Sequence, residues 1–378
     1  MNMVLIAHVS CGIDNGDASE IRTKFIKKGL EEHGYNFKTI SYCYNNGSRH
    51  VSESFRYLSQ DKNNHHWLKK IFVFPILLLF ELIRIHRFPK YMLVDKLPVY
   101  LSVPVFIFSR LFKKKIILIV NEFPNAFIYK KKLSLKSILE YISLKLLGFG
   151  TEVIIVISRE HESIYRSYAN KRCKFIVLPI LMDTSLEYTP VKLNNKIKHI
   201  VYAGAISESN GVELLIESSK VLIDNLVPHH LTIIGPGISK LYIDKLNKKI
   251  NDLGIESVVD ILPPISNNDV INLLRQSDIL VIPKLSDQRS IGYIPSKLGD
   301  FLFTGRPVIC SKLGEISNYV VHGKSGFLVS PDSVFELSSC IRDVILKYAE
   351  FESVGLEGMK VARAFDYRTQ CDRLLHLL

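Results

Sequence analysis

The sequence predicts an α/β protein made of two doubly wound domains. Its 378 residues exceed what one hydrophobic core usually supports, since domains commonly hold roughly 100 to 200 residues. Short runs of β-branched residues alternate along the chain with segments of helical periodicity, and these runs lack polar alternation. Such runs are typical of parallel strands covered by helices on both faces. We therefore expect two open sheets that face a central cleft.

The first half is expected to begin with a strand and a glycine-containing loop. The apolar run 4–8 leads into the loop SCGIDNGDASE and then into a helix over 21–33, which Gly34 would end. Strand, loop and helix in this order open a nucleotide-binding fold. The strict GxGxxG fingerprint is absent, so the sequence does not predict an NAD site. Further strands are expected at 37–43, 115–120 and 152–157, and further helices at 133–147 and 159–168.

The second half repeats the alternation after a polar stretch, TSLEYTPVKLNNKIK, that ends at Lys198. Helical segments separate several strand-like runs, among them HIVYAGAI, HLTIIGPG, ESVVDIL, DILVIP, PVICSK and GFLVS. A polar stretch between two alternating halves is typical of a domain boundary. The expected domains are 1–190 and 198–360, followed by a terminal helix in 361–378.

One stretch of the second half, RSIGYIPSKLGDFLFTGRPVI, suggests a ligand site. It is expected to form a loop of small residues, a helix opening at Ile294 and Pro295, a stop at Gly305 and a buried strand from Pro307. The free N–H groups and the positive dipole end of this helix would face a phosphate. Asp300, further along the helix, could accept hydrogen bonds from sugar hydroxyls. The stretch therefore predicts a site for a sugar nucleotide.

The positive charge of the chain lies in one segment. Residues 62–145 contain sixteen lysines and arginines against four acids, which accounts for the whole net charge of +12. The same segment holds two apolar runs at 71–83 and 97–109. Each run is shorter than the roughly 18 to 20 residues that cross a bilayer, and no signal peptide precedes them.

We expect this basic, apolar segment to lie on an anionic cytoplasmic leaflet, so that the protein is cytoplasmic and peripheral on the inner face of the plasma membrane. The alternative is that the apolar runs are ordinary core elements and the lysines form a solvated face. No nucleic-acid-binding motif accompanies the charge, so nucleic acid is not an expected partner.

Cysteine and histidine residues do not predict a metal site. The six cysteines show no CxxC spacing and no clustering with histidine, and are expected to be reduced, mostly buried residues of a cytosolic protein. His65 and His66 are expected to be solvated, and His161 is expected to lie on a helix surface.

Several motifs of the second half resemble glycosyltransferase family 4, whose members are retaining enzymes of the GT-B fold. VYAGAISESNGVELLIE, LTIIGPG, SDILVIP, IPSKLGDFLFTGRPVICS and GKSGFLV carry the resemblance. The first half matches more loosely, through VNEFP, EVIIVIS and VLPILMD. The resemblance implies two Rossmann-like domains, and RAFDYRTQCDRLL is similar to the final helix that crosses back to the first domain. It also implies transfer of a sugar from a nucleotide diphosphate to an acceptor, without a metal or other cofactor.

The resemblance assigns donor-binding roles around 289–300. Asp300 would hold the ribose hydroxyls of the nucleotide. Gly292, Tyr293 and Ile294 would offer backbone N–H groups to the donor sugar or diphosphate, and Ser290 belongs to the same loop.

Three further donor-binding residues and the acceptor-side residues lie elsewhere in the chain. Pro264 and Ile265 stand where the family holds the base, and Gly204 follows the first strand of the donor domain. The acceptor is expected over the first domain, where the loop after the first strand supplies four candidate residues: Gly12, Asp14, Gly16 and Asp17.

The chain departs from the family pattern at three positions. Gly292 stands where the family has the first of two acids, and Ala205 and Asn210 stand where it commonly has an arginine and a lysine. Those cations neutralise the diphosphate leaving group, and electrostatic stabilisation is usually the largest catalytic contribution. Our hypothesis is that Arg289 and Lys297, one or both, replace them.

In the first domain, Asn121 and Glu122 directly follow a strand, the position from which α/β enzymes project catalytic groups. Glu122 is one of the four acids of the basic segment and would orient the acceptor hydroxyl, or pair with a neighbouring lysine.

The sequence thus predicts a glycosyltransferase that adds a sugar to a lipid-linked saccharide during synthesis of a bacterial-type surface polysaccharide, such as O-antigen or capsule. Two alternatives remain open. One is a non-catalytic GT-B module that binds a sugar nucleotide or assists assembly, and the other is a soluble transferase acting on a small molecule or protein.

Overall fold

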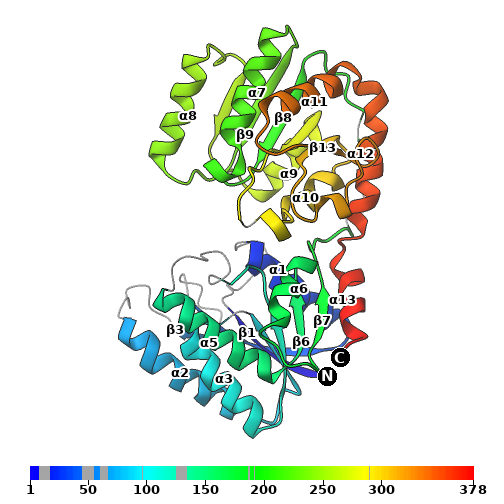
Figure 1. The fold of residues 1–378 in the computed structure, drawn as a ribbon. Helices are drawn as coiled ribbons and strands as arrows, with labels where there is room; N and C mark the ends of the chain where they lie inside the picture. The colour runs from blue at the N-terminus through cyan, green and yellow to red at the C-terminus, as the bar shows by residue number, and fades with distance from the viewer. Residues whose placement is uncertain are drawn as a thin grey trace. The chain divides into compact units, whose positions relative to one another are not determined.

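The computed structural model describes residues 1–7, 18–44, 55–59, 67–95, 97–124, 134–185, 188–190, 192–288 and 290–378. The chain forms two compact units, one made of Met1–Leu181 and Tyr367–Leu378 and the other of Met182–Asp366 (Figure 1). The first unit ends ahead of the polar stretch in which the sequence placed the boundary.

The second unit begins and ends at paired residues. Met182 and Asp366 form an isolated parallel bridge, and the Met182 N–H donates to the carbonyl of Phe365 at 3.1 Å. The Asp366 carboxylate accepts hydrogen bonds from both the backbone N–H and the hydroxyl of Thr184. The two chain crossings between the units are therefore held next to each other.

The first unit contains a parallel sheet of seven strands in the order β3-β2-β1-β4-β5-β6-β7. The strands are β1 Asn2–Ala7, β2 Asn36–Tyr44, β3 Phe55–Ser59, β4 Tyr91–Asp95, β5 Lys115–Ile119, β6 Thr151–Val156 and β7 Lys174–Val177. The strands expected in this half are present as β1, β2, β5 and β6, whereas β3, β4 and β7 were not predicted. The strand order reverses between β1 and β4, and open sheets bind ligands at the carboxyl edge of such a switch point.

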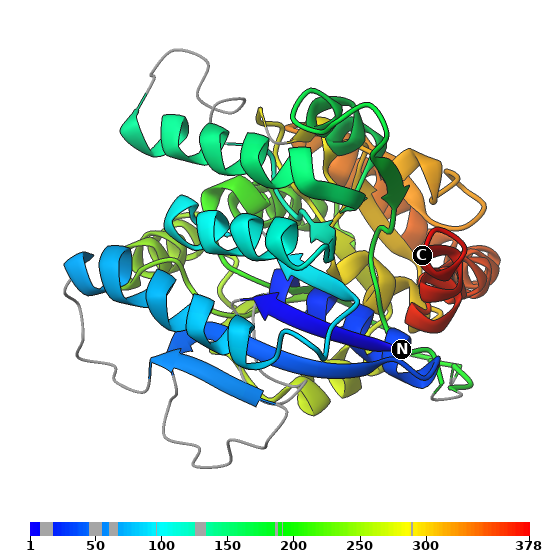
Figure 2. The same ribbon diagram turned by 90° about the horizontal axis from the view of Figure 1, so that it is seen from below.

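Helices cover both faces of this sheet. Helices α1 (Ala18–Glu32) and α13 (Tyr367–Leu375) pack with Met3 and Leu5 of β1 on one face. On the other face, with Val4 and Ile6, lie α2 Trp67–Arg84, α3 Val99–Leu111 and α5 Leu135–Gly150. These three helices run side by side (Figure 2). Burial of alternate residues on opposite faces explains why the strands show no polar alternation.

The second unit contains six parallel strands in the order β10-β9-β8-β11-β12-β13. They are β8 Lys198–Ala203, β9 His229–Ile234, β10 Val259–Leu262, β11 Ile279–Ile282, β12 Val308–Ser311 and β13 Phe327–Val329. The helices are α7 Val212–Asp224, α8 Lys240–Asp252, α9 Asn267–Gln276, α10 Lys297–Phe303, α11 Val334–Leu346 and α12 Tyr348–Arg363. This is the second doubly wound domain that the sequence predicts.

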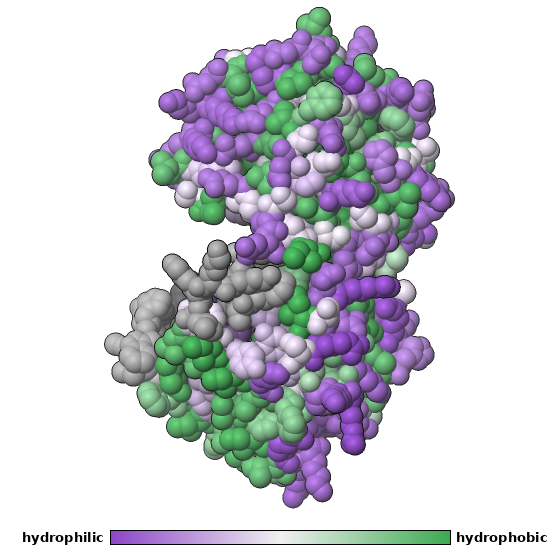
Figure 3. All heavy atoms as spheres, in the orientation of Figure 1, coloured by the Kyte–Doolittle hydropathy of each residue, from purple (hydrophilic) through white to green (hydrophobic). Residues whose placement is uncertain are grey.

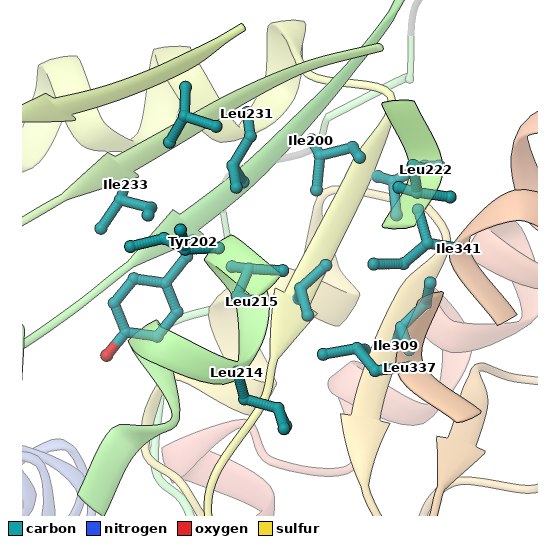
Figure 4. Close-up of a cluster of buried hydrophobic side chains, with 14 of the residues drawn as sticks. Ile200, Tyr202, Leu214, Leu215, Leu222, Leu231, Ile233, Ile309, Leu337 and Ile341 are labelled. Carbon is teal, nitrogen blue, oxygen red and sulfur yellow. The ribbon is translucent and has the colours of Figure 1, made fainter. Parts of the chain in front are cut away.

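A single aliphatic core joins the strands of this unit to α7 and α11. Ile200 and Leu231 of the sheet pack with Leu215 and Ile341 of the two helices (Figure 4). Tyr202 belongs to the same cluster, and its hydroxyl is directed away from the neighbouring aliphatic side chains (Figure 4). The core therefore fixes one aromatic residue close to the end of β8.

Two expectations about local structure are wrong. The helix expected to open at Ile294 and Pro295 begins only at Lys297, so that Asp300 lies in its first turn. The N–H of Leu298 donates to the carbonyl of Pro295 at 3.0 Å, and this tight turn uses a donor that the sequence reading left free for a ligand. His161 is not on the surface, because Phe123 stacks on its ring at 3.8 Å and leaves it 2% exposed.

Four of the cysteines, Cys173, Cys310, Cys340 and Cys371, are free thiols. Within the described ranges, no helix is long and apolar enough to cross a membrane.

Candidate functional site

A lysine from α10 reaches the loop that follows β8. The backbone of Gly204, directly after β8, has a φ of 148°, and a Cβ there would lie 2.4 Å from the Nζ of Lys297. The ammonium group also lies 4.2 Å from the centre of the Tyr202 ring. The missing side chain at Gly204 therefore makes room for the charged end of Lys297, and the predicted residues Gly204 and Lys297 are in contact.

A second lysine, which the sequence reading missed, stands at the same edge of the sheet. Lys284 lies two residues after β11, is 8% exposed, and places its Nζ 3.5 Å from the Asp287 carboxylate. The loop after β8 touches this segment, since a Cβ at Gly211 would lie 1.7 Å from the carbonyl oxygen of Pro283. The ends of β8 and β11 thus bring the two lysines to one region.

The electrostatics of this region favour an anion. Burial and, to a smaller extent, the charge of Lys284 lower the pKa of Lys297 to about 7. A lysine that is desolvated beside another cation loses much of its affinity for protons, and a bound anion reverses this effect. The two ammonium groups therefore form a suitable binding place for a phosphate or diphosphate.

The two positions at which the family pattern has cations are neutral and bonded to each other. The carbonyl of Ala205 accepts hydrogen bonds from the Asn210 amide and the Tyr202 hydroxyl, each at 2.7 Å. These bonds hold the loop after β8 in place without adding charge. Lys297 and Lys284 bring cations to the region from other elements, while Arg289 lies outside the described residues.

The loop to which the sequence assigns donor binding, called the donor loop below, contains a 3₁₀ turn, Ser290–Gly292, whose polar groups are partly used within the protein. The Ser290 hydroxyl donates to the Asp287 carboxylate at 3.1 Å and accepts from the Asp287 N–H at 2.9 Å. The Tyr293 N–H donates to the carbonyl of Ser290 at 3.2 Å. The expectation that Tyr293 offers a free N–H to the donor is therefore wrong, because the turn already uses that group.

The remaining donor candidates lie at the same carboxyl edge. Asp300 is exposed on α10, three residues after Lys297, a spacing that places two side chains on one side of a helix. Pro264 and Ile265 are exposed in the loop after β10, separated from β8 by β9. Gly292 is buried and Ile294 is half-buried beside the loop.

In the first unit, Asn121 is held in a buried network. Its side-chain oxygen accepts from Arg22, and its amide nitrogen donates to the Ser19 hydroxyl and to the Asp95 carboxylate. Arg22, which is 6% exposed, also donates to the carbonyl of Val156 at the end of β6 and to the carbonyls of Leu178 and Pro179, directly after β7. Burial lowers the pKa of Arg22 to about 10 although Asp95 opposes this. Asn121 is thus a positioning residue of the sheet edge.

Glu122 is exposed directly after Asn121. Its carbonyl accepts a hydrogen bond from the Tyr165 hydroxyl at 2.8 Å, which anchors the backbone while the carboxylate faces solvent. The acceptor-side candidates Gly12, Asp14, Gly16 and Asp17 lie outside the described residues. Among the residues that the structure describes, no group of three or more His, Cys, Asp or Glu side chains is placed to hold a metal ion.

Two parallel, doubly wound units, with a C-terminal helix that returns to the first, define the GT-B class of glycosyltransferase folds. Residues 197–347 match the model of the family "Glycosyl transferases group 1". The second unit is therefore a group 1 glycosyltransferase domain, and the predicted resemblance to glycosyltransferase family 4 is confirmed.

Known proteins support the fold over the whole chain. A sucrose-phosphate synthase from Thermosynechococcus elongatus superposes with a TM-score of 0.76 at 14% identity, covering 100% of this chain and 98% of that one. Anabaena HepE in complex with UDP superposes with a TM-score of 0.76 at 14% identity, covering 100% and 99%.

Curated relatives match part of the chain. A D-inositol 3-phosphate glycosyltransferase from Pseudarthrobacter chlorophenolicus is 26% identical over 133 residues, which are 35% of this chain. The match spans 30% of the length of that relative.

Proposed function

We propose that this chain is a glycosyltransferase, a hexosyltransferase-like enzyme of the EC 2.4 class, that takes its sugar from a nucleotide diphosphate donor. The observation that carries the proposal is the lysine pair at the carboxyl edge of the second sheet, within a group 1 glycosyltransferase domain. A UDP donor is favoured, because the structurally similar HepE was solved with UDP.

In the proposed reaction the bond between the sugar's anomeric carbon and the diphosphate breaks, and the acceptor oxygen forms a new bond on the same face. The leaving diphosphate gains negative charge and takes up the acceptor proton. Lys297 and Lys284 stabilise that charge, Arg289 is proposed to assist them, and Asp300 holds the ribose hydroxyls. Because the lysines supply the positive charge, we propose that no metal or other cofactor is needed.

We further propose that the acceptor is a lipid-linked saccharide of surface-polysaccharide synthesis and that the protein works in the cytoplasm on the inner face of the plasma membrane. The basic, apolar segment 62–145 supports this part of the proposal. Glu122 is proposed to orient the acceptor hydroxyl, with Asn121 fixing the backbone from which it projects.

The first test is a thermal-shift screen of the full chain against UDP and GDP sugars. A bound donor raises the melting temperature by mass action. The donor so identified is then assayed for nucleotide release, with and without EDTA, and the anomeric configuration of the product is read by proton NMR. Turnover that resists EDTA and retains configuration supports the proposal, and the absence of any donor-dependent shift would overturn it.

Binding without turnover is a separate outcome of the same assays. Gly292 replaces an acid of the family pattern, and the cations of the β8 loop are absent. A chain that binds UDP but releases nothing from any sugar donor, with a lipid extract as acceptor source, would be a sugar-nucleotide-binding module.

A further inference from the structure

Helix α2 carries an apolar stripe on the side that faces away from the sheet. Phe72, Ile76 and Phe80 follow one another at intervals of four residues and are 64%, 68% and 64% exposed. Phe74 and Leu78, on the opposite side, are buried in the core. Over residues 71–80 the helix is therefore apolar all around, although only one side meets the protein interior.

The neighbouring helices continue the stripe. On α3 the exposed residues are Val103, Ile107 and Leu111, again four apart. On α5 they are Leu135, Ile138, Leu139, Ile142 and Phe149. Because α3 lies between α2 and α5, the three stripes form one apolar patch, which spreads over the lower part of the first unit (Figure 3). Contiguous patches of this kind mark interaction sites.

Positive charge borders the patch. Arg84, Arg110 and Lys113 are exposed at the C-terminal ends of α2 and α3, and Lys136 and Lys145 are exposed on α5. The guanidinium of Arg110 lies 5.3 Å from the ring centres of both Phe106 and Phe149, so it is held at the level of the apolar side chains.

Acids are rare on the same helices. Over the three segments, α3 has no acid, α2 has only Glu81, and α5 has only Glu140. Glu81 lies 3.9 Å from Arg84. The charge beside the patch is thus positive, and a complementary surface must be both apolar and negatively charged.

We propose that the outer stripes of α2, α3 and α5 insert among the acyl chains of an anionic lipid leaflet, with the flanking cations at the phosphate level. Amphipathic helices lie in the plane of such an interface with their apolar side buried below the headgroups. Apolar and basic signals together give stable attachment, where either one alone is weak. The inference deepens the membrane part of the proposed function and rests on it.

A second copy of this chain fits the patch less well. In a two-fold dimer the same surface meets itself, so the cations of the two copies would face each other. The helices carry too few acids to offset this repulsion.

The test is flotation of the full chain with vesicles of phosphatidylcholine alone or mixed with phosphatidylglycerol. The variant Phe72→Ser/Ile76→Ser/Phe80→Ser changes only exposed side chains, and we expect it to bind the mixed vesicles at least about tenfold more weakly. The matched control is Leu241→Ser/Phe335→Ser/Leu346→Ser, which removes apolar residues of the second unit that are at least as exposed and is expected to float as the unchanged protein does. Equal flotation of all three proteins would overturn the inference.

The depth of the α2 side chains in the bilayer distinguishes insertion among acyl chains from binding by charge alone. Phe80→Trp in a Trp67→Phe background leaves one tryptophan, on the α2 stripe. We expect lipids brominated on their acyl chains to quench its fluorescence, and we expect binding to persist in part at high salt, because apolar burial is not screened. Lack of quenching together with complete release by salt would contradict insertion.

Two controls exclude other reasons for a loss of flotation: a damaged donor site and an interface between two copies of the chain. UDP-sugar hydrolysis, measured without vesicles, should be equal in the stripe variant and the unchanged protein, so that loss of flotation does not reflect a failed donor site. If light scattering shows a dimer that the stripe substitutions dissociate while vesicle binding is absent, the patch is an interface between copies and the inference is wrong.

Discussion

Lys297 lies where both burial and the charge of a second lysine lower its pKa, to about 7. The consequence is a group whose protonation responds to the ligand. A diphosphate next to Lys297 favours the ammonium form and raises its pKa above the value of about 7 in the free protein. Binding of UDP above this pH therefore takes up a proton, and the free energy of binding depends on pH.

We expect the affinity for UDP to fall between about pH 7 and about pH 9, by at most about tenfold per pH unit for one linked proton. Below about pH 7 the dependence on Lys297 should level off, because the lysine is charged both with and without the ligand. Titration calorimetry in buffers of different ionisation enthalpy measures the proton uptake. Lys297→Met should bind more weakly and should lose this uptake; uptake that persists in the variant would assign it to another group.

Removal of either lysine should slow the reaction more than it changes the fold. We expect Lys297→Ala and Lys284→Ala each to lower donor turnover by about a hundredfold, since each removes a cation from the developing diphosphate charge. Arg289→Ala tests the third proposed cation in the same assay. Lys324→Ala, at an exposed lysine of the same unit, serves as the control. Near-normal rates in the first two variants would remove the lysine pair from the mechanism.

Arg22 is also a buried cation, but its hydrogen-bond donors bind groups of the protein itself. Its guanidinium donates to three carbonyls and to Asn121. We expect Arg22→Met to destabilise the first unit by about 2–4 kcal/mol, since it leaves buried acceptors without donors. Urea denaturation followed by circular dichroism measures this, with exposed Arg172→Met as the control. Equal midpoints for the two variants would contradict the role.

The sequence identified Lys297 and overlooked Lys284 for a physical reason. Lys297 stands inside a recognisable motif, whereas Lys284 is one lysine after the strand DILVIP. The rule that drew attention to Asn121 and Glu122, a polar residue at the carboxyl end of a buried strand, applies to Lys284 as well. Arg22 gave no signal, because the pattern of a helix does not reveal whether an arginine points to solvent or inward.

At the scale of elements, the donor loop depends on a glycine that lies outside its motif. Gly314, with a φ of 51°, is so close to the loop that a Cβ would lie 2.3 Å from the carbonyl oxygen of Tyr293. The next residue, Glu315, donates its N–H to that same carbonyl at 3.0 Å. The segment after β12 therefore fixes the position of the turn at Ser290–Gly292.

We expect Gly314→Ala to push the donor loop away and to weaken UDP binding, at a cost in stability of about 1–3 kcal/mol. Gly323→Ala is a matched control, because Gly323 also has a positive φ, of 72°, but its Cβ would meet no atom within 4 Å. Binding isotherms and melting temperatures of the two variants are compared. Equal loss of binding in both would show that backbone strain alone, and not the contact with the loop, is responsible.

The sequence predicted the strands and helices of the second unit better than it predicted the residues at which they begin and end. Apolar runs bounded by glycine and proline located its strands, because a buried parallel strand needs such a run. The start of α10 was placed two to three residues too early, since proline is compatible both with a first helical turn and with the tight turn that precedes this helix. In the first unit, the long apolar runs 71–83 and 97–109 could have been read as strands or as helices, because periodicity does not distinguish the two for short apolar runs. They form α2 and α3, and β4 lies between them.

At the scale of the whole molecule, each unit has its own hydrophobic core, yet the first unit is discontinuous in sequence. Helix α13 completes it: Tyr367 stacks on Phe25 at 5.2 Å, and Cys371 packs so tightly on Gly29 that a Cβ there would lie 2.4 Å from its sulfur. Leu374 is fully buried in the same core. The first unit is therefore incomplete without the segment that follows the second unit.

A chain that ends at Asp366 should separate the stabilities of the two units. We expect the first unit to melt at a lower temperature, because it loses the apolar contacts of α13. The second unit, residues 182–366, should keep its own transition and its stabilisation by UDP. Differential scanning calorimetry with and without UDP measures both. Loss of the UDP effect would show that donor binding needs an intact first unit.

The return of the chain at Asp366 also sets an order of events during synthesis. A ribosome adds about 5–20 residues per second, and domains generally fold as they emerge. Here the first unit is synthesised first but cannot complete its core until α13 is made, after the whole of the second unit. The apolar surface of the first unit that α13 covers, beside α1, therefore remains exposed while the 185 residues of Met182–Asp366 are translated. During this time we expect a chaperone that binds apolar surface to bind the nascent chain.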